Sequence, residues 1–118
     1  MITVFNVPTR NLNNSSLSSG LVNLNNFVQV DNCAGMLLRY EVTNVVAGES
    51  LTFTYSIYVN GVFRSGSTLV FTENSTGGIG FDVGGKDDTT QVQGDLTAVG
   101  TVRITATLYA IEVGEDIL

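Results

Sequence analysis

The sequence predicts an all-β protein: a single antiparallel β-sandwich or jelly-roll-like domain of roughly seven to nine short strands, with a polar N-terminal arm. Three observations predict this fold class. Apolar residues recur with a period of two in several segments, turn-forming residues separate those segments, and no long window has the apolar spacing of an amphipathic helix. The 118 residues suit one domain.

The first thirty residues differ in composition from the rest, with seven Asn, four Ser and no acidic residue. We expect a strand at 2–7 and then a stretch in which Leu12 and Leu17 are the only apolar residues between positions 11 and 20. Such a stretch does not order itself in isolation. Two interpretations stay open for residues 1–26: a surface loop that joins the first strand to a sandwich at 27–118, or an arm that orders against a neighbouring subunit.

The clearest strand is expected at 50–60, where large apolar residues alternate with hydroxyl-bearing ones. Asn60 and Gly61 follow, and both residues tolerate the positive φ of a type I′ turn. The pattern therefore predicts a hairpin whose return strand starts through Val62 and Phe63.

Further strands are expected where alternation or a short apolar run lies between turn-forming residues. A turn that carries Gly48 is expected at 44–49. After Ala110 the apolar phase slips to Ile111 and Val113, which indicates a bulge or the end of one-sided burial. The remaining expected strands are 27–31, 36–43, 67–72, 79–83, 90–96 and 102–110.

Composition argues against most catalytic chemistry. The chain has no His and one Cys, so the commonest general base and zinc ligand is missing, and Cys33 is expected to be a small core or turn residue. The net charge of -6 and the five scattered basic residues disfavour a nucleic-acid partner. No apolar stretch is long enough to span a membrane, and the N-terminus lacks the pattern of a signal peptide. We expect a non-enzymatic protein that stays in the cytoplasm of the cell that makes it.

The acidic, Gly-rich loop at 82–90 has two interpretations. The favoured one is a solvated hairpin loop, and the other is a calcium site near Asp87 and Asp88. The spacing of the acids matches no calcium-loop pattern, and Lys86 adds an opposing charge. We therefore expect no cofactor.

Aromatic residues are the remaining candidates for binding. Tyr58 and Tyr109 fall on the polar phases of their strands, where a tyrosine makes a good anchor for a protein–protein contact. Together with Tyr40, Tyr55 and Phe63 they could instead form a platform on which sugars stack.

Three segments, 27–38, 50–55 and 100–106, follow one another in a pattern that we call the strand cadence. An extended segment ends in a turn before a Leu-rich strand, a Ser-Leu-Thr strand follows, and a last strand opens with Gly and Arg. This cadence resembles small β-sandwich structural proteins of tailed bacteriophages, in particular capsid decoration or cement proteins. The resemblance implies a virion part that oligomerises, often as a trimer, and binds the outer surface of a capsid between major capsid subunits.

Our main hypothesis is therefore a capsid decoration protein on the virion surface, with the major capsid protein or another virion protein as partner, which stabilises the lattice through many shallow contacts. One alternative is a carbohydrate- or receptor-binding sandwich of a phage tail or fibre. Another is a self-polymerising appendage subunit whose N-terminal segment pairs with the open sheet edge of the next chain. The expected interface residues are Phe5, Asn11, Leu12, Leu17, Leu21, Leu24, Tyr58 and Tyr109.

Overall fold

The computed structural model describes residues 2–13, 16–20 and 29–112, and within these ranges the chain forms strands and turns without a helix. The all-β expectation is confirmed for this part of the chain. The strands, in chain order, are β1 (Ile2–Asn13), β2 (Ser16–Gly20), β3 (Gln29–Thr43), β4 (Ser50–Val59), β5 (Val62–Phe71), β6 (Ser75–Phe81), β7 (Gly85–Val99) and β8 (Thr101–Glu112).

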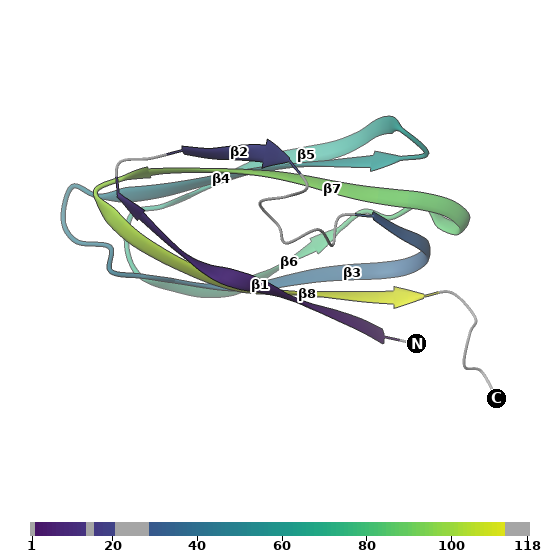
Figure 1. Ribbon diagram of the computed structural model, residues 1–118, viewed down its shortest axis with the longest axis horizontal. Coiled ribbons are helices and arrows are strands. Elements are labelled where there is room, and N and C mark those ends of the chain that lie inside the picture. The colour runs from purple at the N-terminus through teal and green to yellow at the C-terminus, as the bar shows by residue number, and fades with distance from the viewer. Residues whose placement is uncertain (1, 14–15, 21–28, 113–118) are drawn as a thin grey trace.

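The strands form one antiparallel sheet that curls on itself. Its main path runs β1-β8-β3-β7-β4-β5, while β2 pairs with β7 and β6 pairs with β3. The two longest strands belong to both halves of the curl: β3 pairs with β7 near its start and with β8 and β6 further along. Figure 1 shows the result as two layers, with β2, β4, β5 and β7 in one and β1, β3, β6 and β8 in the other.

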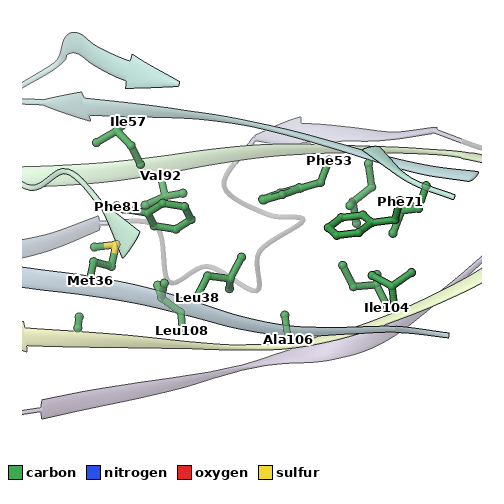
Figure 2. Packing of buried hydrophobic residues seen from close by; sticks show 14 of the residues in the cluster. Met36, Leu38, Phe53, Ile57, Phe71, Phe81, Val92, Ile104, Ala106 and Leu108 are labelled. Carbon is green, nitrogen blue, oxygen red and sulfur yellow. The ribbon is translucent and has the colours of Figure 1, made fainter. Parts of the chain in front are cut away.

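The core lies between these layers, because alternate residues of β3, β4, β7 and β8 point inward (Figure 2). In β8 the burial alternates from Val102 to Ala110, and Leu108 at its centre has no exposed surface. Burying each large apolar side chain stabilises the fold by roughly 1.5–3 kcal/mol relative to leaving it exposed. Cys33 belongs to this core, as expected, and its Sγ–H donates to the Gly35 carbonyl oxygen at 3.1 Å.

Aromatic rings extend the core toward the side formed by β5 and β6. Tyr40 packs against Phe71 with ring centres 5.1 Å apart, and Tyr55 packs against Phe81 at 4.7 Å, both pairs with tilted rings. The Tyr40 ring crosses β6 so closely that a Cβ added at Gly77 would lie 2.6 Å from the phenol oxygen. Glycine at this position is therefore what lets the ring pack against the strand.

The predicted turns are confirmed by their backbone angles. Asn60 and Gly61 have φ values of 52° and 82°, as a type I′ turn requires. The turn between β3 and β4 uses positive φ at Asn44 and Gly48, at 63° and 85°. The Glu49 carboxylate then accepts a bond from Thr101 N at 3.1 Å, which links this turn to the β7–β8 turn.

Several strands are longer than the alternation of apolar residues predicts. Where the alternation is interrupted, the strand contains a bulge and continues, and no loop forms. In β3 the register shifts between Cys33 and Gly35, so that the described part of the segment expected at 27–31, residues 29–31, joins the segment expected at 36–43 in one strand. In β1 the register shifts between Val7 and Arg10, where Pro8 has no N–H to donate to the ladder. The change of apolar phase after Ala110 lies at the same irregularity. Ile111 keeps the outward-facing phase of β8, is 45% exposed, and lies opposite Gly35 at this β3 bulge.

Candidate functional site

One end of the molecule, which we call the hairpin end, brings together the β4–β5 turn and the start of β7. The Asn60 side chain connects them: its Nδ2 donates to Asp88 Oδ1 at 2.7 Å, and its Oδ1 accepts from Thr89 N at 2.9 Å. The backbone N of Asn60 also donates to the Thr89 carbonyl oxygen at 2.8 Å. Three hydrogen bonds therefore hold the turn against β7.

The start of β7 is fixed in turn to the start of β3. Asp87 N donates to Asn32 Oδ1 at 2.7 Å, and Thr89 Oγ1 donates to Asp31 Oδ1 at 2.7 Å. Asn32 and Asp87 both adopt positive φ, 54° and 67°, a conformation that Asn and Asp tolerate better than most residues. The polar residues of this end thus form a bonded network across three elements.

An exposed apolar cluster lies on the hairpin that this network holds. Tyr58 and Phe63 are cross-strand partners whose rings meet edge to face, with centres 5.9 Å apart at 80°. Phe63 is 59% exposed and its neighbour Val62 is 68% exposed. We call Tyr58 and Phe63 the tip patch; Val62 lies opposite Val59 and therefore faces the other side of the hairpin. The aromatic surface of the tip patch is held on a backbone that hydrogen bonds fix in place, and such residues are typical anchors of protein–protein contacts.

Tyr109, the other predicted anchor, belongs to a different face. It is half-buried between the fully buried Leu108 and Ala110, and it lies opposite Leu37, which is 40% exposed. Because Tyr109 is on the outer side of the β3–β8 layer and Tyr58 on the outer side of the β4–β7 layer, the curl places the two tyrosines on opposite faces. A single flat partner cannot use both.

The aromatic residues that were candidates for one sugar platform are also separated. Tyr40 and Tyr55 pack against the core with Phe71 and Phe81. Tyr58 and Phe63 form the pair at the hairpin end. Only this second pair remains as a stacking surface.

The N-terminal candidates lie partly within the described strands. In the register of β1 and β8, Phe5 lies opposite Leu108, Asn11 opposite Arg103 and Leu12 opposite Val102. Leu17 of β2 lies opposite Leu96 of β7. Leu21 and Leu24 lie outside the described residues. Both described N-terminal strands thus pair with strands of their own chain.

The acidic loop is built into the hairpin end. One Asp88 carboxylate oxygen accepts from Asn60, while Arg64 Nη1 donates to the Val83 carbonyl oxygen at 3.4 Å. In the described ranges, no three His, Cys, Asp or Glu side chains gather into a group that could hold a metal ion. Those ranges also contain no helix that could cross a membrane.

Residues 62 and 63 show what strand periodicity alone does not identify. Val62 lies on no clear apolar phase, yet two apolar residues directly after a two-residue turn lie at the end of a sheet, where neighbouring strands cover little of them. The position of the Asn-Gly turn is the signal that could have identified these two exposed residues. Comparisons with protein-family models, curated proteins and solved structures found no match to this chain.

Proposed function

We propose that this protein is a non-enzymatic structural protein of a bacteriophage virion, a capsid decoration protein that binds the head lattice and stabilises it. The observation that supports this proposal most is the tip patch, an exposed apolar cluster on the end of the molecule that hydrogen bonds hold in place. The resemblance of the strand cadence to decoration proteins supplies the kind of partner.

We also propose that the curled sheet is a jelly-roll-type sandwich. The two halves, β1-β8-β3-β6 and β2-β7-β4-β5, would be its two sheets, joined where the starts of β3 and β7 pair. Such a domain carries rigid turns at its ends, and those turns are available for contacts without disturbing the core.

The mechanism follows from the rigidity of the hairpin end. A contact made by residues that are already ordered loses little conformational entropy on binding, so even a small apolar patch contributes usefully. When many copies bind a repeating lattice and each bridges neighbouring capsid subunits, their modest contributions add up against the pressure that separates those subunits.

The test removes the tip patch and measures binding to heads that lack the protein. We expect the double variant Tyr58→Ala/Phe63→Ala to lose at least tenfold in affinity for the heads, since the few hot-spot residues of an interface, which are often aromatic, contribute about 2 kcal/mol or more each. The matched control is Val46→Ala, at a residue that is 60% exposed on the turn after β3. We expect the control to bind the heads and restore their heat and osmotic stability as the unaltered protein does.

If neither the unaltered protein nor its variants bind heads, or if heads are equally stable with and without it, the decoration proposal is wrong. The same purified variants separate the carbohydrate-binding alternative, which the aromatic pair beside Asn60 and Asp88 would also suit. Binding of a glycan by the unaltered protein and by Val46→Ala, lost in Tyr58→Ala/Phe63→Ala, would favour that alternative.

A further inference from the structure

Strand β5 is the last strand on one side of the sheet path. In the described part of the chain it pairs with β4 alone, along its whole length. Ser67 and Thr68, at its middle, are both exposed. A strand in this position presents a row of backbone N–H and C=O groups that can pair with another strand.

The other edge strands of the described sheet carry features that discourage such pairing. β1 contains Pro8 and a bulge, β2 has five residues and an irregular register, and β6 has seven residues of which three are glycine. β5 has ten residues, no proline and Arg64 as its single charge, and its one register shift lies at the turn end, so that the strand is regular from Ser65 to Phe71. Of these edges, β5 is the one best suited to accept a strand.

The sequence of β5 also identifies the strand that it would accept. We propose that β5 pairs antiparallel with β5 of a second copy, in the register that places Thr68 opposite Thr68 of the partner subunit. In this register Ser67 faces Leu69 of the partner subunit, Gly66 faces Val70, and Ser65 faces Phe71. Each large apolar residue of one half thus meets a small residue of the other half, and opposed positions share a face of the sheet.

On the outward-facing side of β5, this register brings exposed apolar side chains of the two copies together. A Cβ added at Gly66 would lie 3.6 Å from the Phe63 ring, so this ring borders the bare backbone of Gly66. Phe63 and Val70 are 59% and 60% exposed and lie toward opposite ends of β5. The pairing brings Val70 of the partner subunit opposite Gly66 and beside the Phe63 ring, and two-fold symmetry makes this contact twice.

Charge is compatible with the same arrangement. Arg64 of one copy would face Thr72 of the partner subunit, so no like charges oppose each other in the paired strands. Because the same surface serves both copies, the contact closes as a dimer and does not propagate into a filament. The inference does not rest on the proposed function, since it concerns how two copies meet. Phe63 of the tip patch borders this contact, whereas Thr68 lies outside the tip patch, so the Thr68 variants test the pairing alone.

The first experiment measures the solution mass of the full chain by light scattering. We expect twice the chain mass of 12.6 kDa. Thr68→Lys places two like charges opposite each other at the two-fold axis, so we expect it to be monomeric. Thr68→Val removes the 3.1 Å hydroxyl contact with Thr54 but adds no charge, so we expect it to remain dimeric.

Thr68→Asp separates loss of pairing from loss of the fold. Alone, it should be monomeric for the same reason as Thr68→Lys. Mixed in equal amounts, the two variants should form a heterodimer, because opposite charges then face each other at the axis. A misfolded variant would fail to recover in the mixture, and its circular dichroism would differ from that of the unaltered protein.

Cross-linking tests the register directly. With oxidised glutathione as oxidant, Thr68→Cys should form a disulfide between the two copies, whereas Thr76→Cys, at an exposed position of β6, should not. Cys33 does not compete, because it is fully buried. A monomeric unaltered chain, a dimer or trimer that Thr68→Lys leaves intact, or a Thr68→Cys dimer that does not cross-link would each overturn the proposal. These results leave capsid binding to its own test with the tip variants.

Discussion

At the scale of single residues, Asn60 shows how one side chain can organise a surface. Its backbone takes the positive φ that the turn needs, and its amide bonds both to the Asp88 carboxylate and to the backbone of Thr89. Glycine could satisfy the first requirement and not the second. Asn60 therefore supports the tip patch, because it fixes the turn of the hairpin to β7 beyond the last pair of the β4–β7 ladder.

We expect Asn60→Gly to lower the free energy of unfolding by about 1–2 kcal/mol, through loss of the side-chain hydrogen bonds. Asn60→Ala should cost about 1 kcal/mol more, because alanine at positive φ is strained. Urea unfolding of the two variants and the unaltered protein measures both differences. Equal stability of the Gly and Ala variants would show that the turn relaxes to another conformation.

At the scale of elements, the N-terminal strands bear on the two interpretations of residues 1–26. β1 pairs with β8 along both sides of its bulge, and β2 pairs with β7. The strands that they pair with carry much of the core, including Leu96, Val102 and Leu108. In this arrangement the described part of the N-terminal segment, β1 and β2, belongs to the domain's own sheet.

Deleting residues 1–20 should therefore unfold the protein, because β8 and β7 would lose hydrogen-bonded neighbours beside fully buried residues. Far-ultraviolet circular dichroism and thermal melting check this expectation, with a cooperative transition present in the full chain and lost in the deletion variant. A deletion variant that melts cooperatively but no longer assembles would instead support an arm that orders against a neighbouring subunit.

At the scale of the whole molecule, stability depends on the curl that brings the two layers together (Figure 1). Residues from β3, β4, β7 and β8 meet in one core, although they are far apart in the sequence (Figure 2). Leu108 is fully buried near the middle of this core, while Val99, at the end of β7, is 53% exposed.

We expect Leu108→Ala to lower the free energy of unfolding by about 2–5 kcal/mol, since it removes buried methyl groups and leaves a cavity. Val99→Ala, the matched control, should change it by no more than about 0.5 kcal/mol. Chemical denaturation of both variants measures the difference. Similar losses in the two variants would contradict the assignment of inner and outer faces.

Much of the local structure could be predicted from residue patterns. The alternation at 51–59 predicted β4, and the Asn60-Gly61 pair predicted its turn. Cys33 was expected to be a small core or turn residue, and it is a buried core residue. β2 was missed because its five residues, Ser16–Gly20, contain one apolar side chain and give no periodicity. Its position as a strand comes from pairing with β7, a contact that no local pattern records.

The sequence by itself determined the all-β class, the main turns and which residues of β4 and β8 are buried, because alternation and turn chemistry act between neighbours in the chain. The tertiary structure alone decided which strands pair. It merged segments through bulges at Asn32–Gly35 and Val7–Arg10, and it placed Tyr58 and Tyr109 on opposite faces while bringing Asn60 to Asp88. Strand pairing joins residues distant in the chain, so its register depends on how whole faces bury against one another.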